Sequence, residues 1–100
     1  MPYERTIEIA LAEGVVVRFN QSGQPIDRYA VLLLVFEAGE WHTVRAYDNH
    51  LGTHHMHRYT RTAGKHEPEG FHSGPTKAAI PAAIAHLKAH WEAIIEQWKS

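Results

Sequence analysis

The chain of 100 residues contains no cysteine. This absence excludes a disulfide framework, a thiolate zinc site and catalysis by a cysteine nucleophile, and it is compatible with a reducing compartment. Long apolar runs are also missing, because the longest, from Ala30 to Phe36, is far too short to cross a bilayer. The segment from Met1 to Glu4 lacks the basic and apolar regions of a signal peptide. These absences predict a cytoplasmic protein with no membrane association.

The chain also has almost no excess of positive or negative charge, since its formal net charge is only −1 with neutral histidines. A protein with this balance does not coat nucleic acid by charge alone. The distribution of charge is more informative, because between Trp41 and His66 a single acid, Asp48, stands against four cations. This region predicts a local anion-binding face, although cations on exposed strand edges also serve to discourage aggregation. The four cations are Arg45, Arg58, Arg61 and Lys65.

Apolar residues alternate with polar ones along 7–11 and 15–20, which is typical of half-buried strands. The continuous apolar run over 31–36 predicts a central strand that is covered on both sides. Similar reasoning extends the strand-rich region over residues 3–61. A chain of this length makes one domain, so we expect a single domain spanning 1–100.

The remainder of the chain divides into a connection and a helix. Residues 62–75 are polar and rich in glycine and proline, which predicts a mobile connection or one that folds across a surface. Apolar residues then recur at three- and four-residue steps, which predicts a helix over about 77–99. We therefore expect an α+β fold, in which an antiparallel sheet of four or five strands packs one face on this helix. The other face is left for function.

Histidines crowd the middle of the chain, where four of the nine lie within eight residues, at 50, 54, 55 and 57. Imidazole changes charge between about pH 5 and 8 and also binds metals, so this crowding points to function rather than folding. Because side chains alternate along a strand, one face should carry His55, His57, Tyr59 and Arg61, with Arg58 on the other face. An antiparallel return of the chain over 49–53 would bring Asp48 and His50 close to this strand.

One chemistry that could use the cluster is metal-free cleavage of RNA. A base removes the ribose 2′-hydroxyl proton, an acid protonates the leaving oxygen, and cations stabilise the charge on phosphate. No cofactor is needed for this reaction. The candidate catalytic residues are Asp48, which would orient an imidazole, together with His50, His55 and His57. The candidate RNA contacts are Arg58, Tyr59, Arg61 and Lys65.

Two other functions remain open at this point. His55 and His57 could bind a divalent metal with His50 or Asp48 as third ligand, but no strong ligand motif is present and nearby arginines would repel the ion. The chain could instead be a protein-interaction module, for which exposed aromatic residues would suit the interface. The sheet edge from Tyr3 to Leu11 could also pair with a second copy.

The order of a strand-rich half, a Tyr47-Asp48-Asn49-His50 element, a His54-His55-Met56-His57 cluster and a downstream helix resembles TumE-type toxins of prokaryotic toxin–antitoxin systems. The resemblance covers about residues 26–66. It implies an intracellular protein that is neutralised by a cognate antitoxin protein. The crowded histidine run departs from the family pattern, which leaves open which imidazole is the matched one and whether the chain is an active toxin. The matched positions are Asp48, Asn49, His50, His55 and His57.

Overall fold

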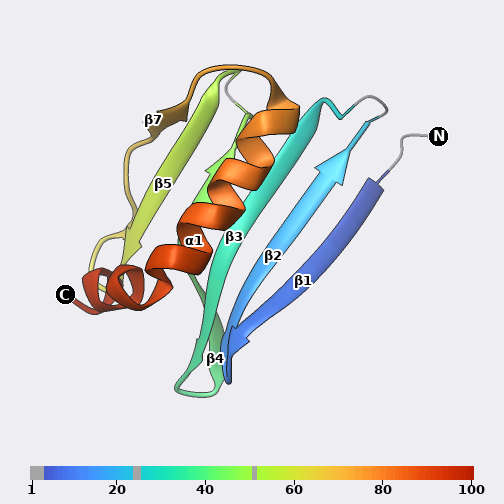
Figure 1. Ribbon diagram of the computed structural model, residues 1–100. Coiled ribbons are helices and arrows are strands. Elements are labelled where there is room, and N and C mark those ends of the chain that lie inside the picture. Colours follow the sequence, from blue (N-terminus) through green and yellow to red (C-terminus); the bar gives the residue numbers. More distant parts are fainter. Residues whose placement is uncertain (1–3, 24–25, 51) are drawn as a thin grey trace.

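The computed structural model describes residues 4–23, 26–50 and 52–100 (Figure 1). Within these residues, seven strands come first, and one long helix follows them. The coarse prediction of an α+β fold with a single C-terminal helix is therefore confirmed. The elements are β1 (Glu4–Ala12), β2 (Val15–Ser22), β3 (Arg28–Glu37), β4 (Glu40–Asp48), β5 (His54–Thr60), β6 (Gly64–Lys65), β7 (Glu69–His72) and α1 (Thr76–Lys99).

The strands form an antiparallel sheet in the order β1-β2-β3-β4-β5-β6, and β7 also pairs with β5. From β1 to β6, consecutive strands are thus neighbours in the sheet, which short connections allow, whereas β7 returns to pair with β5. The turn between β3 and β4 has two residues, Ala38 and Gly39, with φ angles of 55° and 80°. Positive φ at both central residues matches the right-handed twist of the flanking strands.

The predicted count of four or five strands was too low. The two additional strands, β6 and β7, lie within 62–75, the segment predicted as a connection. They are only two and four residues long, and both pair with β5. Strands this short carry no readable alternation, so only their pairing partner reveals them. The predicted mobility of this segment is a separate property and stays a prediction.

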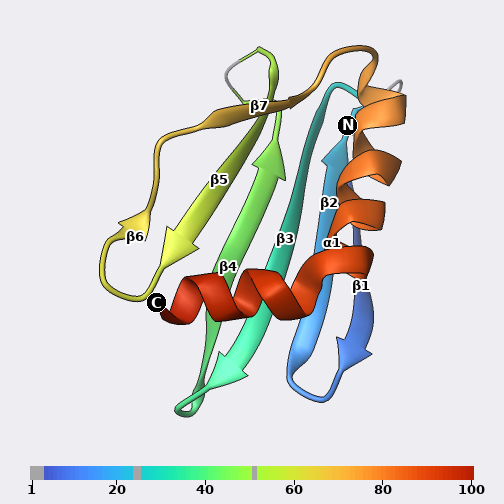
Figure 2. The same ribbon diagram turned by 60° about the vertical axis from the view of Figure 1, so that its left-hand side comes forward.

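The helix starts at Thr76, one residue before the predicted boundary, and it contains Pro81. Figure 2 shows that α1 bends midway, so that its C-terminal half crosses β3 and β4 toward β5. Within the described part of the chain, no helix is long and apolar enough to cross a membrane.

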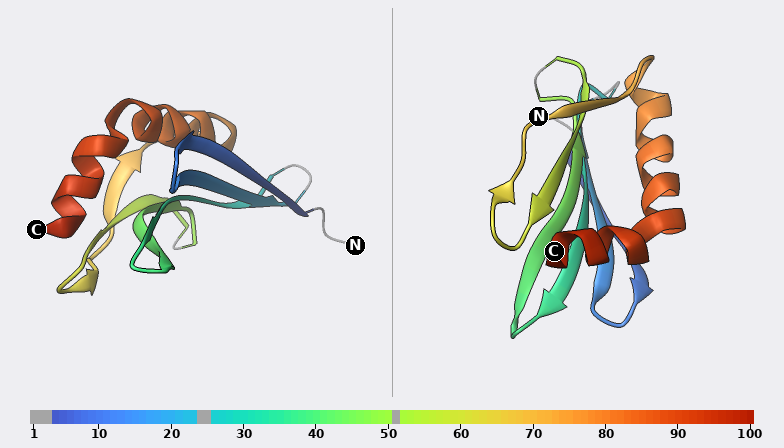
Figure 3. Two further views of the ribbon diagram at one scale, coloured as in Figure 1. Left: turned by 90° about the horizontal axis from the view of Figure 1, so that it is seen from below. Right: turned by 90° about the vertical axis from the view of Figure 1, so that its left-hand side faces the viewer.

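The core lies between α1 and one face of the sheet (Figure 3). Strand partners share a face, and Val17, Leu33 and Leu87 in this layer are fully buried. Burying such side chains supplies most of the stability of a small domain. In the described part of the chain, no helix covers the opposite face, which we call the open face. It carries Thr6, Asn20, Ala30, Asp48 and His55.

Candidate functional site

The strand register divides the histidine cluster between the two faces. Asp48 lies opposite His55, and Ala46 lies opposite His57, so these side chains occupy the open face. Met56, between the two histidines, faces α1 and belongs to the core. Alternation along β5 therefore places His55 and His57 together, as the sequence predicted.

Asp48 is the centre of the open-face group, and only 7% of it is exposed. Its Oδ1 accepts a hydrogen bond from the backbone N–H of His50 at 3.2 Å. Its Oδ2 lies 4.0 Å from Nε2 of His57, a distance too long for a hydrogen bond but close enough for electrostatic attraction to the protonated ring. One carboxylate thus holds the loop after β4 and faces an imidazole.

His57 is equally buried, with an exposed fraction of 7%. Its Nδ1 lies 3.2 Å from the carbonyl oxygen of His66. A carbonyl oxygen only accepts hydrogen bonds, so Nδ1 is the protonated nitrogen and Nε2 is the one that faces Asp48. A second proton on the ring would point an N–H toward the carboxylate. Because a buried carboxylate is costly without compensation, packing alone does not explain this pair.

Asn49 fixes the loop that follows. Its Oδ1 accepts from the backbone N–H of Tyr29 at 3.1 Å, and its Nδ2 donates to the Asp27 carbonyl oxygen at 2.8 Å. These two bonds join the end of β4 to the start of β3. The acid-asparagine-histidine element therefore has a structural role, since Asp48 and Asn49 together position His50.

The His50 side chain is exposed and lines a cavity of about 340 Å³ on the open face. Arg28 and Asn20 line the same cavity, together with Ala30, which lies directly opposite Asp48 in the sheet. Among the described residues, Arg28 has no ion-pair partner. The cavity thus brings the side chains of His50 and Arg28 to one place, and Ala30 in its lining is the sheet neighbour of Asp48. Sequence reasoning missed Arg28, because it lies 20 residues before Asp48 and outside the histidine cluster.

His55 is half-buried on the same face, and its Nε2 lies 3.2 Å from Oγ1 of Thr53. A threonine hydroxyl both donates and accepts, so this contact is compatible with either tautomer of the ring. His55 therefore stands beside Asp48 with a partner that does not fix its protonation.

His54 has a different role on the opposite face. The hydroxyl of Tyr29 lies 2.8 Å from its Nδ1, and its Nε2 lies 2.8 Å from the Gly74 carbonyl oxygen. Nε2 must donate to the carbonyl, so Nδ1 accepts from the phenol. Burial, and secondarily the negative charge of Asp48, raises the pKa of Tyr29 to about 12, which keeps this phenol a donor. His54 thus joins β5 to β3 and to the residues before α1.

The predicted RNA contacts do not gather around His55 and His57. Arg58 points to the helix side, opposite Arg45, and its Nε lies 2.8 Å from Glu69 Oε2. Lys65 is exposed on β6, and the half-buried Tyr59 packs against the core. Burial, and secondarily Asp48, also raises the pKa of Tyr59.

Arg61 is a correction to the sequence reasoning. It was expected to share a face with His55 and His57, but β5 ends at Thr60, so strand alternation does not extend to it. Its guanidinium instead pairs with Glu37 and stacks over the Trp98 ring at 4.7 Å. Its backbone N–H donates to the Trp98 carbonyl oxygen at 2.9 Å. Arg61 therefore holds the end of β5 against the helix.

The metal site considered from the sequence gains no geometric support. Within residues 4–23, 26–50 and 52–100, no three histidine, aspartate or glutamate side chains come together as metal ligands would. The two nitrogens of the buried His57 already face a carbonyl and a carboxylate.

The fold and this site define an α+β protein with a polar, histidine-containing group on the open face of a sheet. The family described as a domain of unknown function, DUF7718, matches residues 2–100, and the chain belongs to this family. No curated protein and no solved structure matches the chain.

Proposed function

We propose that this protein is a toxin-like RNA-cleaving protein of the TumE type, acting in the cytoplasm and neutralised by a cognate antitoxin protein. The observation that carries the proposal is the arrangement around Asp48, whose carboxylate faces the buried His57 and holds the backbone of His50. The same three positions belong to the motif that resembles TumE-type toxins.

The exposure of the histidines assigns their roles in this proposal. His50 and His55 reach the surface of the open face, so they are the acid and base that touch the RNA. His57 is buried and acts through Asp48 as a positioning residue. The reaction needs no cofactor, because the 2′-hydroxyl is the nucleophile. One imidazole removes its proton, and the other protonates the leaving oxygen.

Arg28 replaces Arg58 and Arg61 as the phosphate contact nearest the catalytic group. It lines the same cavity as His50, whereas Arg58 and Arg61 are paired with Glu69 and Glu37. An unpaired guanidinium offers two parallel N–H donors to a phosphate oxygen pair. Lys65 and Tyr59 stay candidates for contacts farther along the strand.

The test is incubation of the purified protein with RNA, with and without a chelator. We expect chelator-resistant cleavage with a bell-shaped pH profile near neutrality, because one imidazole must be neutral and the other protonated. His50→Ala and His55→Ala should each lower the rate at least about a hundredfold while the melting temperature changes little. His90→Ala, on the exposed side of α1, is the matched control. His57→Ala is less informative, because the buried ring also contributes to stability.

A second candidate function is a non-catalytic protein-interaction module. It is favoured by Phe36 and Trp41, which are 49% and 50% exposed and contact each other edge to face at 5.3 Å. Exposed aromatic pairs of this kind are typical of the centres of interfaces. If the wild-type protein and the double variant of His50 and His55 leave RNA equally intact, the catalytic proposal fails and this candidate takes its place.

A further inference from the structure

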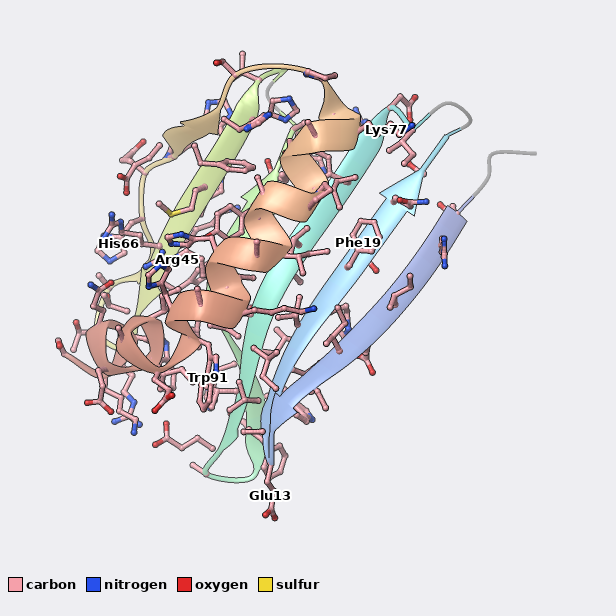
Figure 4. All side chains as sticks on the ribbon, viewed as in Figure 1. Glu13, Phe19, Arg45, His66, Lys77 and Trp91 are labelled. Carbon is pink, nitrogen blue, oxygen red and sulfur yellow. The ribbon has the colours of Figure 1, made fainter. Side chains whose placement is uncertain are left out.

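A second polar site lies on the helix side of the sheet, around Arg45. This residue stands on β4 beneath the C-terminal half of α1, and only 5% of it is exposed. Figure 4 labels it beside the helix, on the side of β5 and His66. Arginine is almost never buried to this extent unless its charge is paired.

The pairing of Arg45 is incomplete. Its Nη2 donates to Oε1 of Gln97 at 3.2 Å, while its buried Nε has no hydrogen-bond partner. Among the described residues, no carboxylate forms an ion pair with it. A buried charged donor without a partner costs more than a hydrogen bond normally contributes.

Charged side chains near Arg45 add positive charge. Its polar neighbour is the buried Tyr47 hydroxyl, whose pKa is raised by burial, an effect that the nearby Arg45 guanidinium opposes. Arg58 lies directly opposite in the β4–β5 ladder, a position where like charges destabilise a sheet. Glu69 pairs with Arg58 rather than with Arg45. The pKa of His86 is lowered, first by partial burial and then by repulsion from His90, Arg45 and Arg58, so this positive field reaches the helix.

A cavity of about 250 Å³ adjoins these groups. Its lining is mostly apolar, with Val44 and Ile94 among the walls, and it includes the polar residues Arg45, Arg58, His66 and Gln97. This volume suits a small molecule rather than a chain of nucleotides. The guanidinium geometry suits an oxyanion, which accepts parallel N–H bonds and neutralises the charge.

We propose that the cavity between α1 and strands β4 and β5 binds a small oxyanion, either a phosphate group or a carboxylate of a small molecule, with Arg45 as its central ligand. The bound oxyanion accepts from the guanidinium of Arg45 and supplies the missing counter-charge. Arg58 and His66 contribute at the open side of the cavity. Arg45 lies on the opposite face from His50 and His55, so each proposal can fail without the other, although Tyr59, a candidate RNA contact, also lines this cavity.

The test measures the thermal unfolding midpoint of the full chain during titration with inorganic phosphate and, in parallel, with acetate, both against chloride at constant ionic strength. A ligand that binds only the folded state raises the midpoint as its concentration passes the dissociation constant. We expect a saturable rise with one of the two anions, and the anion that gives it distinguishes phosphate from carboxylate. Arg45→Gln should weaken this anion at least about tenfold, because a charge-assisted hydrogen bond is lost.

Arg18→Gln is the matched control, because Arg18 is an exposed arginine on the open face, paired with Glu8. It should keep the full response. If Arg45→Gln fails to fold, two other measurements decide. Arg58→Gln, at a half-exposed position, should weaken the anion several-fold, and the Nε–H resonance of Arg45 should shift on titration of the wild-type protein. Equal midpoints with both anions and chloride, or an undiminished response in Arg45→Gln, would show that the helix C-terminus alone compensates Arg45 and would overturn the proposal.

Discussion

The two faces of the sheet hold their histidines in different ways. On the face covered by α1, both ring nitrogens of His54 have hydrogen-bond partners, Tyr29 and Gly74. On the open face, His50 is exposed beside a cavity, and the buried His57 faces a carboxylate at 4.0 Å. Neighbouring histidines in one strand therefore serve different purposes, because each face offers different partners.

The difference shows that a histidine cluster in a sequence is not a single site. A covered histidine must satisfy its polar atoms within the protein, so its hydrogen bonds contribute to stability. On the open face, His50 keeps its ring accessible to ligand and solvent, whereas His57 is buried against Asp48. Substitutions that separate stability from activity should therefore follow the faces rather than the order of residues in the chain.

The largest contrast between the faces should appear in their apolar residues. Leu33→Ala should lower the free energy of unfolding by about 2–5 kcal/mol, since this fully buried side chain leaves a cavity under the helix. Leu32→Ala, the neighbouring position on the open face, should cost less than half of that, because Leu32 is partly exposed. Urea unfolding of the two variants measures the difference. Equal losses would mean that another surface covers the open face.

A smaller contrast is expected between the adjacent histidines. His54→Ala should cost about 1–3 kcal/mol, because it leaves the Tyr29 hydroxyl and the Gly74 carbonyl oxygen without this partner. His55→Ala should change stability by about 0.5 kcal/mol or less. Chemical denaturation gives the stabilities, and RNA cleavage should show the reverse order of effects. Similar stability losses in both variants would place His55 among the structural residues.

The smallest effect concerns pH and the hydroxyl of Tyr29. The pKa of this phenol is raised to about 12, whereas an unfolded tyrosine titrates near its ordinary value of 10.0. The folded state therefore holds the proton more tightly, and the associated stability is complete below pH 10 and is lost as pH rises toward 12. Tyr29→Phe should make this decline shallower and remove one late tyrosinate step from the ultraviolet titration. An unchanged titration would show that the phenol is not buried as described.

Much of the fold could be predicted because its signals are local. The apolar run over 31–36 and the spacing of apolar residues after Thr76 each reflect the geometry of one element. The short strands β6 and β7 could not be predicted in this way, since they are defined by pairing with β5 rather than by their own residues. The same limit applies to Arg61, whose position depends on Trp98 at the end of the chain.

The candidate site likewise has some features that follow from local sequence patterns and others that depend on distant contacts. Alternation along β5 was sufficient to place His55 and His57 on one face and Arg58 on the other. Arg28 could not be found, because only the pairing of β3 with β4 brings its cavity next to Asp48. The burial of His57 and the incomplete pairing of Arg45 were equally invisible, since both depend on residues far away in the chain.

The sequence by itself determined which residues share a face of a strand and where the apolar stripe of the helix runs, because backbone geometry repeats every few residues. Only the tertiary structure decided which face the helix covers and which polar groups are buried there. The physical reason is that the free energy of a buried charge or imidazole depends on its partners, and folding draws those partners from distant parts of the chain.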